Sequence, residues 1–293
     1  MISTIEKVLR KEMNISPKTN LSYLKYSTPI SGKGVGCKVI FFVFVGENKM
    51  PSFVVKSVRT EINAFSIREG YENMSLLNNL TKNTEFDSMF PKMIHIHDDN
   101  GGIFTIETMC SGLKMGRDEN IDKVFKIYTS FSKHLLSSSK DKILLNFEYG
   151  KKILESLNGS KEDIDNLSKY LLGLWNNLNV ELPSIYQHGD LTIDNILLDR
   201  GNVRMIDCDT FGNIRVPGFD ISHLSTRKKL FNSLDRLNTY FKDMNISYTV
   251  DKKILSIYFL HELYIKKDYI LLKKNSEEVI KDFENILKIY NLN

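Results

Sequence analysis

One stretch of the chain combines carboxylates and an asparagine in a spacing suited to chemistry on phosphates. It contains the motif His188-Gly189-Asp190-Leu191, with Asn195 five residues after Asp190 and Asp207 twelve residues after Asn195. Phosphoryl transfer needs a carboxylate that orients and deprotonates the attacking hydroxyl. It also needs hard oxygen ligands that hold Mg²⁺ on the nucleotide phosphates. The spacing therefore predicts Asp190 as the base and Asn195 and Asp207 as metal ligands.

The residues that connect these groups predict a short hairpin. Ile196 to Leu198 and Val203 to Ile206 are β-prone runs, and Asp199-Arg200-Gly201-Asn202 between them is a turn sequence. A hairpin of this length would place Asn195 and Asp207 side by side at its open end. Asp190 would lie on the loop that precedes it.

The loop HGDLTIDNIL, followed by MIDCD, resembles motifs of the aminoglycoside phosphotransferase and choline kinase family. The resemblance runs from about Leu21 to about Leu224 and matches nothing beyond. It implies an α+β, bilobal protein-kinase-like fold, with a small antiparallel β lobe carrying one helix and a larger, mainly helical lobe. We expect a nucleotide-binding lobe at residues 1–109 and a catalytic and acceptor-binding lobe at residues 110–293.

The N-terminal third contains the parts of a nucleotide site. Gly32 and Gly34 lie between two β-prone segments, where glycines let backbone N–H groups approach phosphate oxygens. Alone, this run is better explained by a hairpin turn, and its place upstream of the HGD motif is what favours the phosphate role. Phe53-Val54-Val55-Lys56 predicts a strand that ends on Lys56, which matches the phosphate-binding lysine of kinases.

The resemblance also assigns partners to this lysine and to the nucleotide base. In the family an Arg-Glu pair opens the next helix and its Glu pairs with the lysine. Glu69 is therefore the expected partner, and Glu72, near the same helix face, is the alternative. Glu107-Thr108-Met109 leaves the last predicted strand of the lobe, where the family binds adenine through backbone atoms. We expect the carbonyl of Glu107 and the N–H of Met109 to make those contacts.

Two further groups near the motif are assigned by position. Asp220 precedes a predicted helix and, as in related kinases, would brace the catalytic loop (residues 188–195). His188 would fix this loop rather than carry protons. Asp209 is equally consistent with a further metal or substrate neighbour and with a turn residue.

The second half of the chain predicts helices. Apolar residues recur at helical spacing from Ile121 to Leu135. Ile254 to Leu272 is apolar nearly all round, which predicts a buried helix, and Trp175 is expected in the core.

Composition sets the protein class. The 293 residues are 42% hydrophobic and 26% charged, which is ordinary for a globular protein and sufficient for two lobes. A net charge of +4 is too small to indicate nucleic-acid binding. Three widely spaced cysteines indicate a reducing compartment rather than disulfides or zinc. We recognise no signal peptide, and the longest apolar run is too short to span a bilayer, so we expect a cytoplasmic protein without a membrane partner.

The resemblance implies a kinase that transfers the γ-phosphate of ATP or GTP, with Mg²⁺, to a hydroxyl of an aminoglycoside, sugar or amino alcohol. From Ile221 to Asn293 the chain has 13 Lys+Arg and 9 Asp+Glu, which mildly disfavours a polycationic acceptor. The alternative is a catalytically silent nucleotide-binding regulator, although such proteins usually lack at least one of Asp190, Asn195 and Asp207. A protein kinase is disfavoured because the loop reads HGD and no A-P-E segment is recognisable.

Overall fold

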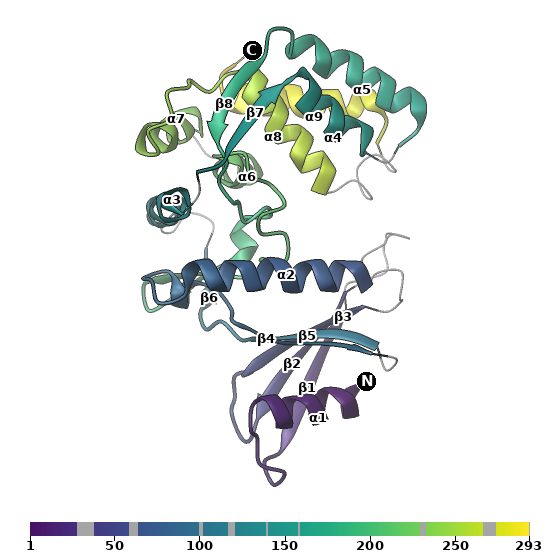
Figure 1. The fold of residues 1–293 in the computed structure, drawn as a ribbon, viewed down its shortest axis with the longest axis vertical. Coiled ribbons are helices and arrows are strands. Elements are labelled where there is room, and N and C mark those ends of the chain that lie inside the picture. The colour runs from purple at the N-terminus through teal and green to yellow at the C-terminus, as the bar shows by residue number, and fades with distance from the viewer. Residues whose placement is uncertain are drawn as a thin grey trace. The chain divides into compact units, whose positions relative to one another are not determined.

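The chain forms two compact units, described in a computed structural model for residues 1–27, 38–58, 64–99, 102–116, 121–138, 140–157, 159–228, 233–265 and 274–292. Unit 1 comprises Met1–Leu113 and Leu197–Thr210, and unit 2 comprises Lys114–Ile196 and Phe211–Asn293 (Figure 1). The helices and antiparallel strands of these units confirm the predicted α+β, two-lobed class.

The units differ from the predicted lobes in two respects, because unit 1 extends to Leu113 and also contains the segment Leu197–Thr210. Contacts within that unit hold the segment. Ser111 Oγ donates to Asp199 Oδ2 at 2.6 Å, and Arg204 donates to the carbonyl of Ser88. A boundary drawn once along the sequence cannot represent a strand pair that returns to the first unit.

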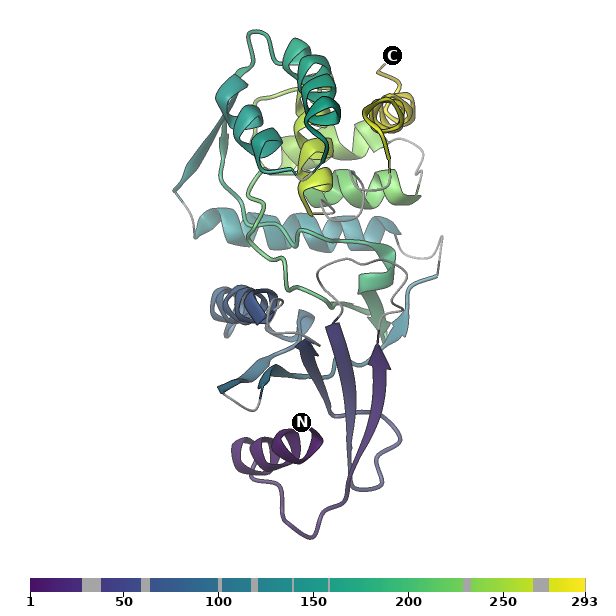
Figure 2. The ribbon, with the colours of Figure 1, turned by 90° about the vertical axis from the view of Figure 1, so that its right-hand side faces the viewer.

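Unit 1 is built on a five-stranded sheet among its described residues, with the order β1-β2-β3-β5-β4 and antiparallel pairing between neighbours. Its strands are β1 (Leu21–Ser27), β2 (Lys38–Val45), β3 (Phe53–Val58), β4 (Met93–Asp99) and β5 (Gly102–Thr108). A helix covers each face, α1 (Ile2–Glu12) on one side and α2 (Ala64–Thr81) on the other (Figures 1 and 2).

The two faces of this sheet differ because side chains alternate along each strand. The face toward α1 is apolar, with Ile5 and Leu9 packed against Val43, Val55 and Ile106. The face toward α2 is apolar near Ile67, Val58 and Ile103. The strand registers Ile40↔Lys56 and Val54↔Glu107 put Lys56 and Glu107 on this second face as well.

The predicted hairpin is present in the segment that returns to unit 1. Strands β9 (Ile196–Asp199) and β10 (Asn202–Met205) pair, and β9 also pairs with the short strand β6 (Leu113–Lys114). Arg200 and Gly201 have φ angles of 50° and 86°. Positive φ at both central residues is typical of the tight two-residue turn that matches strand twist.

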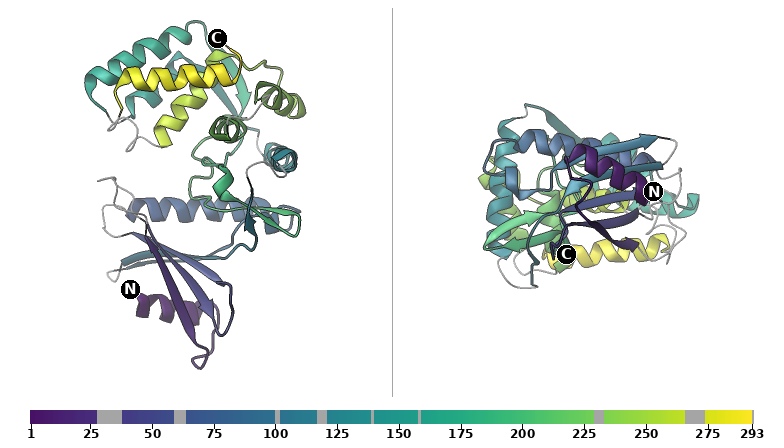
Figure 3. Two further views of the ribbon diagram at one scale, coloured as in Figure 1. Left: turned by 180° about the vertical axis from the view of Figure 1, so that it is seen from behind. Right: turned by 90° about the horizontal axis from the view of Figure 1, so that it is seen from below.

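Unit 2 is mainly helical. Its helices are α3 (Ile121–Ser137), α4 (Phe147–Glu155), α5 (Lys161–Leu174), α6 (Phe219–Lys228), α7 (Ser233–Asp243), α8 (Lys252–Ile265) and α9 (Ser276–Ile289). Strands β7 (Lys142–Asn146) and β8 (Asn179–Pro183) form an antiparallel pair, and β8 leads into the loop that carries Asp190. Helix α8 is buried from Ile254 to Leu260, as its all-round apolar sequence predicts, and contacts α4, α5 and α9 (Figure 3). Residues 266–272 of the predicted buried helix lie outside the described residues. Among the described residues, no helix combines the length and apolar character needed to span a membrane.

Trp175 is fully buried, as predicted, and its Nε1 donates to Ser256 Oγ at 2.7 Å. Its ring lies directly against Gly150 of α4. A Cβ added at Gly150 would lie 2.2 Å from the ring carbon Cζ3, whereas a Cβ added at Gly173 of α5 would meet nothing within 4 Å. The absence of a side chain at Gly150 therefore permits the close packing of Trp175.

We expect Gly150→Ala to lower the free energy of unfolding by about 1–3 kcal/mol, because the added methyl overpacks the core against Trp175. The matched control, Gly173→Ala, should raise it by about 0.5–1 kcal/mol, because alanine lowers the entropy of the unfolded chain without a clash. Urea unfolding of both variants measures the difference. Equal stabilities would contradict this packing.

Candidate active site

Lys56 lies inside β3 rather than at its end. The sequence predicts a strand that stops at Lys56, but Ser57 pairs with Phe104 and Val58 pairs with Lys38, so the strand continues to Val58. A lysine within a strand and under a covering helix is shielded from water, and the Lys56 side chain is only 7% exposed. Its ammonium group must therefore be paired with carboxylates.

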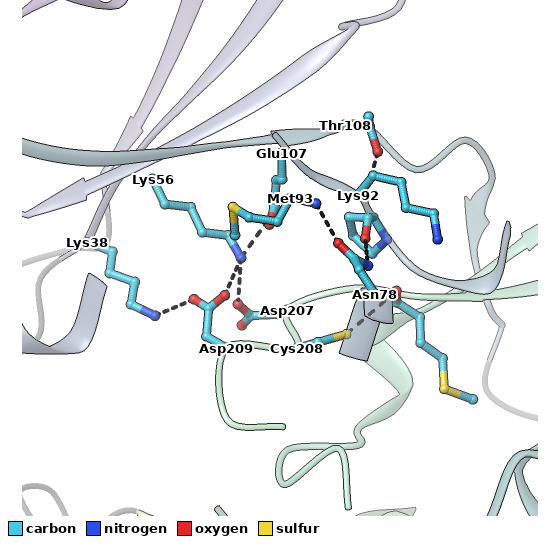
Figure 4. Close-up of polar contacts among 12 residues, drawn as sticks. Lys38, Lys56, Asn78, Lys92, Met93, Glu107, Thr108, Asp207, Cys208 and Asp209 are labelled. Atoms are coloured by element: carbon cyan, nitrogen blue, oxygen red, sulfur yellow. Dashed lines mark hydrogen bonds and ion pairs between the residues drawn. The ribbon is translucent and has the colours of Figure 1, made fainter. Parts of the chain in front are cut away.

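Carboxylates from two parts of unit 1 surround the Lys56 ammonium (Figure 4). Nζ lies 2.8 Å from Asp209 Oδ1, 3.3 Å from Glu107 Oε1 and 3.4 Å from Asp207 Oδ1. Glu107 reaches the lysine because Val54↔Glu107 and Lys56↔Thr105 are facing pairs. Lys56 and Glu107 are thus diagonal neighbours on one face of the sheet.

The partner that the resemblance assigns to Lys56 is therefore replaced. Among the described carboxylates within ion-pair distance of Nζ, neither Glu69 nor Glu72 occurs. From helix α2, Gly70 and Asn73 face Asp209. In this structure Lys56 pairs with Asp209, Glu107 and Asp207 instead of Glu69 or Glu72. The role of Glu69 in nucleotide binding stays a prediction.

Asp209 lies in a turn, one of the two roles left open by the sequence, and its carboxylate is a buried counter-ion. Its carboxylate is 11% exposed and also contacts Lys38 Nζ at 2.5 Å. Asn73 Nδ2 donates to its carbonyl at 2.8 Å, and a Cβ on Gly70 would approach its side chain to 3.3 Å. Sequence reasoning missed Lys38. The only indication in the sequence was strand alternation, which places Lys38 on the same face of β2 as Ile40, the residue that pairs with Lys56.

The electrostatics of this cluster follow from burial and mutual pairing. Burial alone would lower the pKa of Lys56, but Asp209, Glu107 and Asp207 outweigh it and raise that pKa well above its usual value. Burial also raises the pKa of Glu107 to about 7, against the opposing effect of Lys56. Asp209 resists the effect of burial because Lys56 and Lys38 hold its pKa well below the usual range.

Asp207 differs from Asp209 in being open to ligands. Its side chain is 52% exposed, although it contacts Lys56. Its φ angle is 59°, in the left-handed region that non-glycine residues rarely adopt. Such backbone strain gathers at functional sites, where the surrounding structure fixes it. An exposed carboxylate beside a lysine suits a ligand that carries both phosphates and a divalent cation.

The linker after β5 carries the residues that are predicted to contact adenine. The N–H of Met109 donates to the carbonyl of Ser52 at 3.0 Å, which extends the β3–β5 ladder by one step. Met109 N–H is thus engaged within the sheet in this structure, and its contact with a base stays a prediction. The carbonyl of Glu107 stays a prediction. Gly32 and Gly34 lie outside the described residues.

In unit 2, the backbone of the catalytic loop is held by Asp220 at the start of α6. The fully buried carboxylate of Asp220 accepts hydrogen bonds from the N–H of His188 at 2.6 Å and of Gly189 at 3.0 Å, and from the hydroxyl of Tyr128. Gly189 has a φ of 87°, where glycine is favoured, so the loop can present both N–H groups to one carboxylate. The predicted bracing role of Asp220 is confirmed by these bonds.

Asp190 and Asn195 meet at the same loop. Asn195 Nδ2 donates to the carbonyl of Asp190 at 2.9 Å and to its Oδ2 at 3.3 Å. The side chain of Asp190 is 35% exposed, so its carboxylate is both held and open to ligands. In the described part of the chain, no donor contacts Asn195 Oδ1, which leaves that oxygen for a cation.

Comparison with solved structures identifies the architecture. The chain is similar to a choline kinase from Cryptosporidium parvum Iowa II, with 15% identity, a TM-score of 0.58 and coverage of 99% of this chain and 96% of that chain. The choline kinase LicA from Streptococcus pneumoniae gives 12% identity, a TM-score of 0.56 and coverage of 98% and 99%. The fold is that of choline kinases and aminoglycoside phosphotransferases.

A thermostable mutant of the aminoglycoside phosphotransferase APH(4)-Ia also has this kinase-like fold. It gives 11% identity, a TM-score of 0.60 and coverage of 98% of both chains, and its structure is a ternary complex with ADP and hygromycin B. No protein-family model matches the chain, and no curated protein matches its sequence. At these identities the comparisons establish the kinase-like fold.

We expect Asp220→Ala to lower the free energy of unfolding by about 2–5 kcal/mol, because it leaves the buried N–H groups of His188 and Gly189 without an acceptor. Tyr128→Phe is the control, because it removes one donor to the same carboxylate and leaves both N–H groups bonded. It should cost about 1–2 kcal/mol. Urea unfolding compares the two variants, and an equal or smaller loss for Asp220→Ala would contradict the bracing role.

Proposed function

We propose that this chain is a small-molecule kinase that transfers the γ-phosphate of ATP or GTP to a hydroxyl of an aminoglycoside, sugar or amino alcohol. Asp190 acts as the base, and Asn195 and Asp207 hold Mg²⁺. The observation that carries the proposal is the state of Asp190. Its loop is fixed by Asp220, its carboxylate is held by Asn195, and a third of its side chain stays exposed.

The chemistry follows from that carboxylate. The acceptor hydroxyl gives its proton to Asp190 while its oxygen forms a bond to the γ-phosphorus. The bond from that phosphorus to the β–γ bridging oxygen breaks, and ADP or GDP leaves. A base already fixed by its neighbours spends little free energy on ordering when the acceptor binds.

The two proposed metal ligands, Asp207 and Asn195, fit a phosphate-bound Mg²⁺. This ion is usually held by one or two carboxylates together with substrate phosphates, rather than by a cage of protein ligands. Within the residues that the structure describes, no cluster of three or more His, Cys, Asp or Glu side chains could form such a cage. The exposed carboxylate of Asp207 and the amide oxygen of Asn195 are ligands of the preferred kind. When bound, Mg²⁺ would neutralise charge on the transferring phosphates.

The nucleotide is assigned to unit 1 through Lys56. Its pKa is raised, so it carries a full positive charge at neutral pH, and Asp207 beside it is exposed. The ternary complex of the aminoglycoside phosphotransferase named above contains ADP, which supports a nucleotide donor. Its second ligand, hygromycin B, supports a small hydroxyl-bearing acceptor in general, while the net charge of the C-terminal region argues against a strongly cationic one.

We expect ATP or GTP at millimolar concentration with Mg²⁺ to raise the melting temperature by mass action. Lys56→Ala should shrink that shift, measured against its own nucleotide-free melting temperature, since loss of the buried lysine also destabilises the protein. Lys92→Ala, which removes a part-exposed lysine of the same unit that pairs with Asp87, should leave the shift unchanged. A chelator, or Asp207→Ala, should remove the Mg²⁺-dependent part. No shift with either nucleotide would contradict the kinase proposal.

Turnover is tested with a coupled ADP-release or GDP-release screen over aminoglycosides, sugars, amino alcohols and nucleosides. With the acceptor that the screen identifies, Asp190→Asn should lower kcat by roughly 10²- to 10⁴-fold with little change in nucleotide KM, because the base acts on chemistry. The matched control is Asp194→Asn, four residues further along the loop and 76% exposed, which should keep kcat.

An Asp190→Asn variant that retains most of its turnover would overturn the base assignment. A wild-type protein that binds nucleotide and phosphorylates nothing in the broad screen would favour the silent regulator instead.

A further inference from the structure

A buried histidine connects Asp190 to a second carboxylate. The ring of His223, which belongs to α6, has its Nε2 3.4 Å from Asp190 Oδ1 and its Nδ1 3.7 Å from Glu262 Oε2. The His223 side chain is 1% exposed, and Glu262 on α8 is 15% exposed. Sequence reasoning assigned no role to either residue, because 39 positions separate them along the chain.

The first turn of α6 explains where the ring lies. His223 follows Asp220 by three residues, so the two side chains share a helix face. Asp220 holds the backbone of the loop at His188 and Gly189, and His223 contacts the side chain of the next residue, Asp190. The ring of Phe219 stacks on the imidazole at 5.7 Å between centroids and 13° between planes, which fixes the ring orientation.

Among the described residues, the other titratable groups near the imidazole have partners of their own. From α8, the Tyr258 hydroxyl donates to the carbonyl of Pro217, and His261 pairs with the Tyr149 hydroxyl at 2.8 Å. At the end of α9, the Tyr290 hydroxyl contacts Ser222. Burial would lower the pKa of His223, but Asp190 and Glu262 outweigh it and raise that pKa to about 9. The ring is therefore an imidazolium at neutral pH.

The consequence for Asp190 is that its carboxylate is held at both oxygens. Oδ1 faces the imidazolium and Oδ2 accepts from Asn195 Nδ2. The terminal torsion of an aspartate is otherwise broad, because it joins a tetrahedral carbon to a planar group. A hydrogen bond at Oδ2 and an ion-pair contact at Oδ1 limit this torsion and leave the remaining lone pairs for the acceptor hydroxyl.

We propose that His223 is a positioning residue for Asp190, in which the charged imidazole bridges that carboxylate to Glu262 and sets its orientation for the acceptor. The proposal rests on the function proposed for Asp190. His223 already carries its proton, so it takes none from the acceptor. The proton of the acceptor hydroxyl passes to Asp190 and then leaves through the exposed side of that carboxylate. Glu262 holds the imidazolium from the other side.

The kinetic test compares His223→Gln with His261→Gln. His261 is a matched control, because it is also buried, packs against the same Phe219 ring and contacts a tyrosine instead of a carboxylate. We expect His223→Gln to lower kcat by roughly 10- to 100-fold, the size seen when a partner behind a functional group is removed, with nucleotide KM unchanged. Wild-type kcat should fall as pH rises through about 9, where His223 loses its proton. This alkaline limb should be absent in His223→Gln and present in His261→Gln.

A second measurement is independent of turnover. The ring proton resonances of the six histidines are assigned by substitution and followed by NMR against pH. One of them should titrate near pH 9 and disappear in His223→Gln. Asp190→Asn and Glu262→Gln should each lower the pKa of this histidine, because each removes a negatively charged partner.

The outcomes separate the two proposals. A His223 titration that neither substitution moves would overturn the contact itself. The positioning role would be overturned if the His223 pKa falls in both variants as expected but His223→Gln keeps full kcat and an unchanged alkaline limb. Full turnover in Asp190→Asn would instead overturn the base assigned under the proposed function.

Discussion

A charged group can be buried in a protein only where other groups compensate for the lost hydration, and both candidate sites are organised by this requirement. In unit 1 the group is Lys56, which the β3 ladder and helix α2 shield from water. Glu107 and Asp209 surround its ammonium, and Lys38 balances Asp209 in turn. Exposed Asp207 is the member of this cluster with a surface open to ligands.

The same requirement acts in unit 2 on Asp220. Its carboxylate has no exposed surface, so it must accept hydrogen bonds, and the donors are the backbone N–H groups of the catalytic loop together with Tyr128. Loss of water from one carboxylate thereby fixes the path of the main chain on either side of Gly189. One helical turn later, His223 contacts Asp190, so a single short stretch of α6 orients both the backbone and the side chain of the loop.

It matters structurally that Glu107, the glutamate that contacts Lys56, lies on a strand and not on a helix. A glutamate on α2 would tie the lysine to the position of a helix, whereas Glu107 ties it to the register of the sheet. Lys56 and Glu107 stay diagonal neighbours as long as β3 and β5 remain paired.

The features that depend on local pattern could be predicted from the order of residues. The spacing of Asp190, Asn195 and Asp207 pointed to one loop and one hairpin, and the Arg200-Gly201 turn is where the turn residues predicted it. The spread of apolar residues around α8 correctly indicated a buried helix. In these cases neighbours along the chain decide the structure, through helical periodicity, strand alternation or allowed backbone angles.

Tertiary structure alone decided the partners of the buried charges. Lys38 and Asp209 are 171 positions apart, and the contact of Lys56 with Glu107 depends on which strands pair and in which register. His223 and Glu262 meet through the packing of α6 against α8. The sequence likewise gave no indication that Leu197–Thr210 belongs to unit 1. Residue types can show that a charge needs a partner, but only the packed chain selects which distant group supplies it.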